Sequence, residues 1–165
     1  MSVAFRRAGP GDVPAMLAIY AAARQFMAEA GNPGQWRDGY PGEALLARDA
    51  GAGDMYLCCE GEKILAAFYF KTGDAPEPCY DTIDGAWKKP GPYGVLHRVA
   101  VAPDAHGRGV AAACFAWCFA RCGHLRIDTH RDNRPMQRAL EKSGFVRCGT
   151  VRLAGGEERW AYEKC

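Results

Sequence analysis

The hydrophobic pattern changes its period along the chain and so separates predicted strands from predicted helices. In residues 95–101, Val95, His97, Val99 and Val101 alternate with other side chains, and the β-branched valines favour an extended strand. In residues 13–27, apolar side chains recur every three or four positions, which indicates a helix packed on one face. Strands are predicted at 4–7, 55–60, 63–71, 95–101, 124–129, 145–153 and 157–164.

Turn and cap residues delimit the predicted helices. Asp12 precedes the first helix, Asp132 or Asn133 caps the last, and Gly144 follows its end. Helices are predicted from 13 to near 31, at 43–50, from 110 to about 122, and from 134 to just before Gly144. This order of strands and helices predicts a mixed α/β sandwich built on one central sheet.

Length and charge narrow the class of protein. A chain of 165 residues predicts a single domain, 1–165, with a core that needs no disulfides. Lys and Arg number 21 against 19 Asp and Glu, so the net charge of +2 gives no electrostatic reason to expect a nucleic-acid or membrane-surface partner. No apolar run is as long as a membrane span and the start lacks a signal-peptide core, so we expect a cytoplasmic protein.

The eight cysteines are expected to be reduced thiols, because no export signal accompanies them and none forms a CxxC pair. Cys114, Cys118 and Cys122 share one helix face at a spacing that could in principle hold a soft metal. Small buried thiols are common in apolar helices, so we expect core cysteines and no metal. Cys58 and Cys59 are adjacent in a strand and should point to opposite faces.

Residues 93–122 carry the clearest chemical pattern. After the predicted strand, Pro103 ends the extended run, and Gly107 and Gly109 lead directly into an apolar helix. Glycines let backbone N–H groups approach a ligand closely, and a helix N-terminus adds partial positive charge. The pattern therefore predicts an anion site suited to a pyrophosphate.

Two turn-rich segments are candidates for a binding site. Residues 31–41 contain Trp36 and Tyr40, and residues 72–92 combine four prolines and three glycines with several acidic side chains. Long loops in compact domains often act as lids, although a solvated surface loop is the simpler interpretation of 72–92.

These motifs together resemble the GNAT superfamily of acyl-CoA-dependent N-acetyltransferases over most of the chain. The resemblance lies in the glycine loop after the strand, in Asn133 at the start of the next helix, and in the sequence Glu141-Lys-Ser-Gly-Phe145. The segments 97–100, 126–133 and 136–137 are similar to one bacterial branch in particular. The resemblance implies a splayed, mixed central sheet of about seven strands flanked by about four helices.

The resemblance also implies a site for acetyl-CoA between the strands predicted at 95–101 and 124–129. The backbone of the first strand would pair with the pantetheine arm, the glycine loop would hold the pyrophosphate, and Asn133 would contact the cofactor from the next helix. A backbone N–H of the same strand would meet the oxyanion that develops on the acetyl carbonyl. The implied cofactor-binding residues are Val99, Ala100, Val101, Gly107, Arg108, Gly109, Val110, Ala111, Ala112 and Asn133.

The chain departs from the family pattern at two positions. His106 stands where the family loop usually begins with Gln or Arg, and the backbone should keep its hold on the cofactor regardless. Leu140 stands where many members carry a tyrosine that protonates the leaving thiolate. A thiol with a pKa of about 8.5 leaves readily near neutral pH, so water could supply that proton.

Transfer to an amine requires a group that deprotonates the ammonium. Three residues are candidates for this catalytic base, namely Asp128, His97 and His130. His97 should share a strand face with Val99 and Val101 by alternation, and His130 should share a side with Asp128. Asp128 could instead pair with Arg126, and either histidine could have only a structural role.

The acceptor is expected to enter beside the two turn-rich segments. The candidate substrate-binding residues are Trp36, Asp38, Tyr40, Tyr80 and Trp87. Aromatic rings with carboxylates suit a small cationic amine, although the same rings could serve as lid packing.

The resemblance predicts an acetyl-CoA-dependent N-acetyltransferase that acts on a small-molecule amine by direct transfer in a ternary complex. The alternatives are a non-catalytic acyl-CoA sensor or interaction module, which Leu140 favours, and a protein or peptide N-acetyltransferase. A phosphate-binding P-loop enzyme is excluded because no Gly-Lys-Ser/Thr follows the loop. The oligomeric state stays open, with a homodimer among the options.

Overall fold

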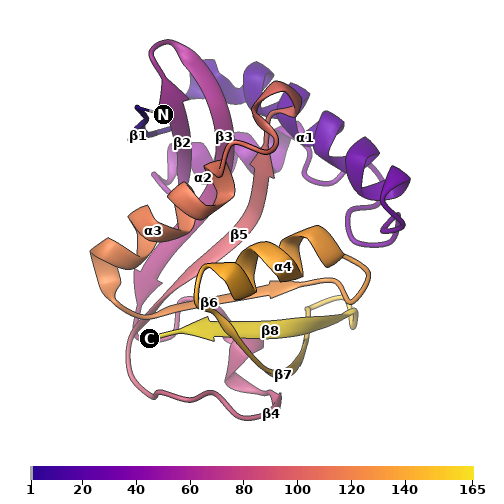
Figure 1. Ribbon diagram of the computed structural model, residues 1–165, viewed down its shortest axis with the longest axis vertical. Helices are drawn as coiled ribbons and strands as arrows, with labels where there is room; N and C mark the ends of the chain where they lie inside the picture. Colours follow the sequence, from indigo (N-terminus) through magenta and orange to yellow (C-terminus); the bar gives the residue numbers. More distant parts are fainter. Residues whose placement is uncertain (1) are drawn as a thin grey trace.

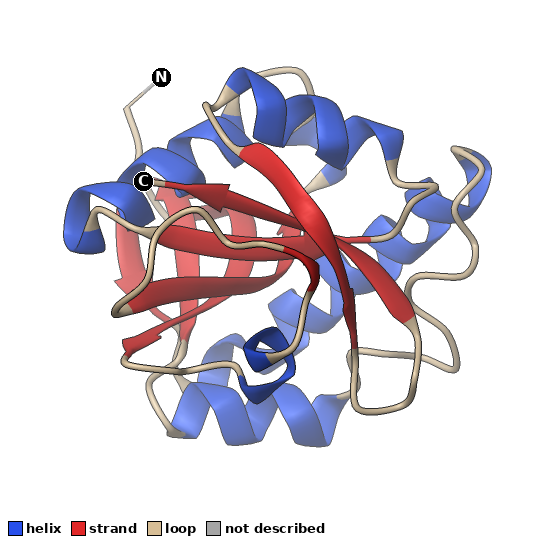
Figure 2. Ribbon diagram, turned by 90° about the horizontal axis from the view of Figure 1, so that it is seen from below, coloured by secondary structure: helices blue, strands red, loops and turns tan. Residues whose placement is uncertain are grey.

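The computed structural model describes residues 2–165, which form one eight-stranded sheet with four α-helices on its two faces (Figures 1 and 2). The strands are β1 (Ala4–Arg7), β2 (Met55–Glu60), β3 (Lys63–Gly73), β4 (Asp84–Gly85), β5 (Tyr93–Val101), β6 (Leu125–Thr129), β7 (Val146–Arg152) and β8 (Glu158–Lys164). The helices are α1 (Val13–Glu29), α2 (Glu43–Gly51), α3 (Val110–Cys122) and α4 (Arg134–Lys142). The sheet order is β1-β2-β3-β5-β6-β8-β7-β4.

The predicted mixed α/β class and the order of the elements are confirmed. The extra strand is β4, a two-residue segment inside the predicted 72–92 loop that pairs with β7 at Thr150 and Gly149. Such a short pairing depends on a distant partner and has no hydrophobic period of its own. Of the two predicted caps for the last helix, Asn133 is the one used, because its side chain accepts a hydrogen bond from the Met136 N–H at 3.1 Å.

The two faces of the sheet have separate apolar cores. Helices α3 and α4 cover one face, where Phe115 and Leu140 are fully buried, and α1 and α2 cover the other, where Met16 and Leu46 are fully buried. Cys58 and Cys59 divide between these two cores, as their adjacent positions predict. Among the described residues, no helix has the length and apolar character to cross a bilayer.

The sheet splays between β5 and β6. Their parallel pairing covers Gly94–Leu96 on β5 and Leu125–Ile127 on β6. Beyond this junction β5 continues beside β3 while β6 stays with β8, and Figure 1 shows the two strands diverging. A side chain at Gly94 would lie 2.6 Å from the Phe70 ring, so the junction packs too closely for any residue except glycine.

A β-bulge lies just beyond the junction. Arg98 and Val99 together oppose Phe68, and Arg98 adopts the left-handed region with φ 54°. The Tyr20 hydroxyl donates to the Arg98 carbonyl at 2.7 Å, and the guanidinium bonds Asp49. These two anchors hold a conformation that a non-glycine residue adopts at a cost of about 1–2 kcal/mol.

Candidate functional site

A groove of about 620 Å³ runs along the open side of β5. Its walls come from the end of β5, the loop after it, the start of α3, one side of α4 and the second half of α1. The predicted cofactor residues that line it are Val99, Ala100, Val101, Gly107, Gly109, Val110, Ala111, Ala112 and Asn133. The folded chain therefore brings these residues from three elements to one surface.

The glycine loop presents backbone donors to this groove. Gly107 and Gly109 have φ of 78° and 74°, and Gly109 is the N-cap of α3. Within an α-helix the first N–H groups have no intrahelical acceptor, so those of residues 110–112 are available to a ligand. With the helix dipole behind them, they form the anion site that the sequence predicts.

The free edge of β5 offers polar backbone groups beside the loop. The Ala102 N–H donates to the Leu65 carbonyl of β3, so by alternation the Val101 carbonyl points away from β3 and toward the gap that β6 has left. His106 Nε2 lies 3.1 Å from this carbonyl oxygen, and an imidazole can only donate to it. A ligand that pairs with this edge would replace His106 there.

Two predicted cofactor residues have other partners in the structure. Asn133 Nδ2 donates to Gln35 Oε1 at 2.9 Å and so ties the loop after α1 to the start of α4. Arg108 points toward the β2–β3 turn, where it forms an ion pair of 2.8 Å with Glu60. A phosphate would have to draw Arg108 away from Glu60, so its role in cofactor binding stays a prediction.

The bulge changes the face on which His97 lies. Alternation predicts His97 on the side of Val99 and Val101, and this prediction is wrong. The extra residue at Arg98 reverses the alternation, so Val99 and Val101 pack toward α3 while His97 faces Tyr69 and Tyr80 on the opposite side.

His97 belongs to a cluster of four polar side chains at the point where β5 and β6 part. Its Nε2 lies 2.7 Å from Glu77 Oε2, and its Nδ1 lies 3.9 Å from Asp128 Oδ2. The Tyr80 hydroxyl donates to the same Asp128 oxygen at 2.6 Å. The strands supply His97 and Asp128, whereas Glu77 and Tyr80 come from the 72–92 segment.

The cluster's protonation states follow from its hydrogen bonds. The hydrogen bond from His97 lowers the pKa of Glu77 to about 2, against the opposing effect of burial. Glu77 is therefore a carboxylate at neutral pH and can only accept, so Nε2 of His97 carries a proton. Burial and the nearby Asp128 charge raise the pKa of Tyr80 well above 10, which keeps its hydroxyl a donor. In neutral His97 the basic lone pair is consequently on Nδ1, which faces Asp128.

The third candidate base lies outside this cluster. His130 follows β6, and its Nδ1 already accepts the Asp132 N–H at 3.0 Å. Burial and the positive charge of Arg159 lower the pKa of His130. The alternative pairing of Asp128 with Arg126 is wrong, because the Arg126 guanidinium bonds Glu163 on β8.

The predicted acceptor residues divide into two groups on the His97 face. Trp36 and Tyr40 lie beside α1, with ring centroids 6.5 Å apart, and the Tyr40 hydroxyl accepts from Arg98 at 3.3 Å. Tyr80 and Trp87 pack together under the other half of the sheet, 5.4 Å apart. Asp38 lies between Trp36 and Tyr40 in the sequence, in an exposed turn, and its φ is 55°.

Sequence reasoning missed Glu77 as a functional residue. It was one of four acidic side chains in a loop with no regular pattern, and its partner is twenty positions away in the chain. The only local sign is the residue order Glu-Pro, which suits the start of a short helix. In the structure the Glu77 carboxylate caps the turn Pro78–Asp81 by accepting the Cys79 N–H at 3.1 Å.

The comparisons with known proteins agree with this architecture. The family model described as "Acetyltransferase (GNAT) family" matches residues 16–145, and the chain therefore belongs to this family. Membership indicates acetyltransferase activity, and the family generally uses acetyl-CoA. A search of curated protein sequences finds no significant match.

Solved structures support the fold over nearly the whole chain. A GNAT-family acetyltransferase from Streptococcus agalactiae shares 29% identity with a TM-score of 0.88, covering 98% of this chain and 94% of that one. A GNAT-family acetyltransferase from Listeria monocytogenes shares 19% identity, with a TM-score of 0.68 and coverage of 98% and 94%. The loading GNATL domain of CurA from Lyngbya majuscula shares 11%, with a TM-score of 0.70 and coverage of 99% and 98%. The last two likenesses show the fold alone.

Proposed function

We propose that the protein is an acetyl-CoA-dependent N-acetyltransferase that acts on a small-molecule amine by direct transfer in a ternary complex. The observation that carries this proposal is the arrangement around the splay. The groove with its loop donors opens along the free edge of β5 between α1, α3 and α4, and the Glu77–His97–Asp128–Tyr80 cluster lies where β5 and β6 part, on the face opposite α3. Donor and acceptor could then meet in the same gap and react without a covalent enzyme intermediate.

The cluster supports a division of roles among the candidate residues. Asp128 would pair with the incoming ammonium, because its carboxylate is oriented by Tyr80 and is only 8% exposed. Nδ1 of His97 would accept the proton, since Nε2 is engaged by Glu77. The 3.9 Å between Nδ1 and Asp128 Oδ2 leaves both atoms within reach of one amine nitrogen.

The chemical step then needs no further protein base. The neutral amine attacks the thioester carbonyl and a C–N bond forms. The positively charged nitrogen of this adduct then loses its second proton to water, and the C–S bond breaks to release the CoA thiolate. A backbone N–H of β5 would hold the oxyanion. Water protonates the thiolate, because Leu140 is fully buried in the apolar core and has no proton to give.

The charges near the gap support one class of substrate. Glu77 and Asp128 provide two carboxylates, and the rings of Tyr69 and Tyr80 lie 5.5 and 6.2 Å from the His97 ring. Aromatic faces and carboxylates favour a cation, so we propose a small amine that is positively charged before reaction. We also propose that the protein is cytoplasmic and has no nucleic-acid or membrane partner. The choice between monomer and homodimer stays open.

One assay tests the function. Release of free CoA thiol from acetyl-CoA should be followed across a panel of small amines, amino acids and peptides. Turnover with a small cationic amine is expected. Tight binding of acetyl-CoA without turnover on any acceptor would instead favour the acyl-CoA sensor, and turnover on peptides alone would favour a protein acetyltransferase.

Two variants then assign the base. His97→Ala should remove the acidic limb of the pH–rate profile and lower kcat about 100-fold or more. Asp128→Asn should mainly raise KM for the amine, because the charge that holds the ammonium is lost. Asp74→Asn, at an exposed carboxylate of the same loop, serves as the control. An unchanged acidic limb in His97→Ala would rule out His97 as the base.

A further inference from the structure

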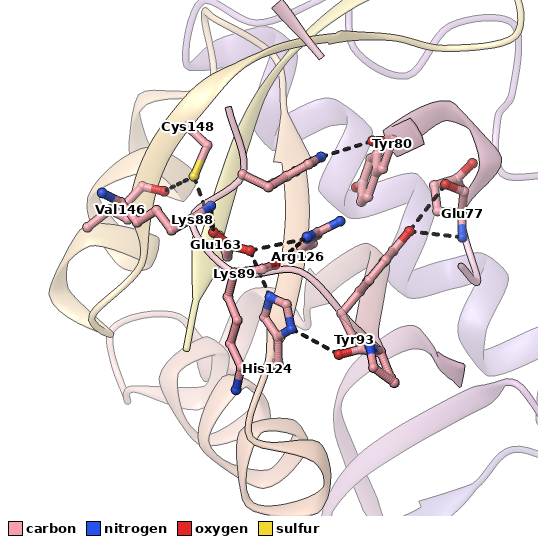
Figure 3. A network of polar contacts seen from close by, with 12 residues as sticks. Glu77, Tyr80, Lys88, Lys89, Tyr93, His124, Arg126, Val146, Cys148 and Glu163 are labelled. Atoms are coloured by element: carbon pink, nitrogen blue, oxygen red, sulfur yellow. Dashed lines mark hydrogen bonds and ion pairs between the residues drawn. The ribbon is translucent and has the colours of Figure 1, made fainter. Parts of the chain in front are cut away.

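A buried ionic network lies behind the proposed proton-transfer cluster. Glu163 of β8 is fully buried and accepts hydrogen bonds from His124 Nε2 at 2.7 Å, from Arg126 Nε at 3.2 Å and from the Lys88 N–H at 2.6 Å (Figure 3). Lys88 belongs to the end of the 72–92 segment. The network therefore ties that segment to β6 and β8, although none of its charged groups takes part in the proposed chemistry.

The guanidinium of Arg126 contacts two aromatic rings and a backbone carbonyl in addition to Glu163. Its centre lies 4.3 Å from the Trp87 ring and 4.4 Å from the Tyr93 ring, and its Nη2 donates to the Lys89 carbonyl at 2.7 Å. An arginine side chain suits this place because it is planar and can present both faces to aromatic rings while its edge forms hydrogen bonds. A lysine ammonium cannot make both sets of contacts at once.

Each of the two rings connects to one half of the cluster. The Trp87 indole N–H donates to the Tyr80 carbonyl at 2.9 Å, and the Tyr80 hydroxyl bonds Asp128. The Tyr93 hydroxyl lies 3.3 Å from the carbonyl oxygen and 3.4 Å from the backbone nitrogen of Glu77 (Figure 3). The Glu77 carboxylate in turn accepts from His97. Both residues that the 72–92 segment supplies to the cluster thus depend on rings that pack against one guanidinium.

We propose that Arg126 is a positioning residue for proton transfer. Through Trp87 it sets the placement of Tyr80 and so of the Asp128 carboxylate. Through Tyr93 it sets the placement of Glu77 and so of the His97 ring. This inference rests on the proposed function, because it assigns Arg126 to the same reaction. Displacing a catalytic group by about an ångström can cost on the order of 100-fold in rate, so this support matters even though Arg126 lies behind the reacting groups.

The first test compares two arginine-to-lysine variants. Arg126→Lys keeps the positive charge toward Glu163 but loses the planar face between the rings. The matched control is Arg121→Lys, because Arg121 also lies over a tryptophan, 3.4 Å from the Trp117 ring centre, but far in the chain from the 72–92 segment. We expect Arg126→Lys to lower kcat about 10-fold to 100-fold with KM for acetyl-CoA within about twofold of the wild type. Equal kcat values for the two variants would overturn the proposal.

A double-mutant cycle tests the route through Trp87. Trp87→Phe keeps an aromatic ring but removes the N–H that holds the Tyr80 carbonyl, and it leaves the Glu163 network intact, so it also serves if Arg126→Lys folds poorly. It should lower kcat with an unchanged KM for acetyl-CoA. If Arg126 acts through Trp87, the combined variant loses less than the product of the two single effects. Fully multiplicative losses would overturn this route.

A measurement without substrate separates this inference from the proposed function. Amide hydrogen exchange of residues 77–82 should be faster in Arg126→Lys than in the wild type and unchanged in Arg121→Lys. If the wild type turns over no amine, the proposed function fails and the exchange comparison alone decides the inference. Faster exchange then supports Arg126 as the residue that positions Glu77 and Tyr80, and equal exchange overturns it.

Discussion

At the scale of single residues, the proposed site depends on how hydrogen bonds assign protons. Glu77 accepts from His97 and from the Cys79 N–H, and Tyr80 donates to Asp128. These contacts leave Nδ1 of His97 as the available base, a choice between atoms that residue type alone does not make. The same contacts make measurable contributions to stability.

Glu77→Gln should change how stability depends on pH. The pKa of Glu77 is lowered from 4.5 to about 2, chiefly by the hydrogen bond from His97. A carboxyl with a lowered pKa stabilises the folded state fully above its unfolded value, and this stability is lost as pH falls through its folded value. The wild type should therefore be more stable than the variant above pH 4.5, with the difference shrinking toward pH 2. Urea denaturation at several pH values measures this.

The control for that series is Glu62→Gln, at an exposed position in the β2–β3 turn. Its free energy of unfolding should follow the wild type over the same pH range. A Glu77→Gln variant whose difference from the wild type stays constant between pH 4.5 and 2 would show that the carboxylate gains nothing from His97 in the folded state.

Leu140→Tyr should not create a proton donor. Leu140 is fully buried among apolar side chains that include Phe115 and Phe145. A larger side chain with a hydroxyl would overpack this site and destabilise the fold by about 1–3 kcal/mol. We expect a lower free energy of unfolding in urea and no gain in kcat. A rise in kcat at unchanged stability would mean that the tyrosine reaches the groove proposed to hold acetyl-CoA.

At the scale of elements, the bulge in β5 decides which groups meet at the splay. It separates His97 from Val99 and Val101, so the proposed base lies on the face opposite these two groove residues. Its left-handed residue, Arg98, is held by a buried ion pair with Asp49 of α2, which is 6% exposed. Helix α2 therefore stabilises β5 although it contributes no group to the proposed chemistry.

Asp49→Ala should be strongly destabilising. Removing one member of a buried ion pair leaves the other charge without compensation and costs about 3–5 kcal/mol. The matched control is Glu158→Ala, which removes an exposed ion pair with Arg152 and should cost at most about 1 kcal/mol. Urea denaturation measures both. Equal losses in the two variants would show that the Arg98–Asp49 pair does not hold the bulge.

The sequence predicts most elements but only part of the site, for physical reasons. Hydrophobic period and glycine placement are local, so β5, α3 and the anion loop are predicted with nearly the observed bounds. The bulge is not predicted, because it depends on Tyr20 and Asp49, which lie far from Arg98 in the chain. The pairing of Glu77 with His97 is likewise a contact between a loop and a strand. The predicted face of His97 is therefore wrong, and Tyr80 as the partner of Asp128 is not predicted from the sequence.

At the scale of the whole molecule, the groove proposed to hold acetyl-CoA bridges the two halves of the splayed sheet. Val101 belongs to the half with β3, and Asn133 follows β6 in the half with β8, yet both line the groove. Within the described residues, direct pairing of the halves is confined to the stretch from Gly94 to Leu96 on β5. A ligand in the groove should therefore stabilise the fold beyond the site itself and couple the motions of the two halves.

Acetyl-CoA should raise the melting temperature. A ligand at 100 times its Kd adds about 2.7 kcal/mol to the stability of the folded state. For a chain of 165 residues this corresponds to a rise of about 5–10 °C. Gly109→Ala provides the comparison, because a side chain at φ 74° strains the loop and displaces the N–H groups of residues 110–112. Its melting temperature should respond less to acetyl-CoA at the same concentration. An equal rise in both proteins would mean that the loop donors do not hold the pyrophosphate.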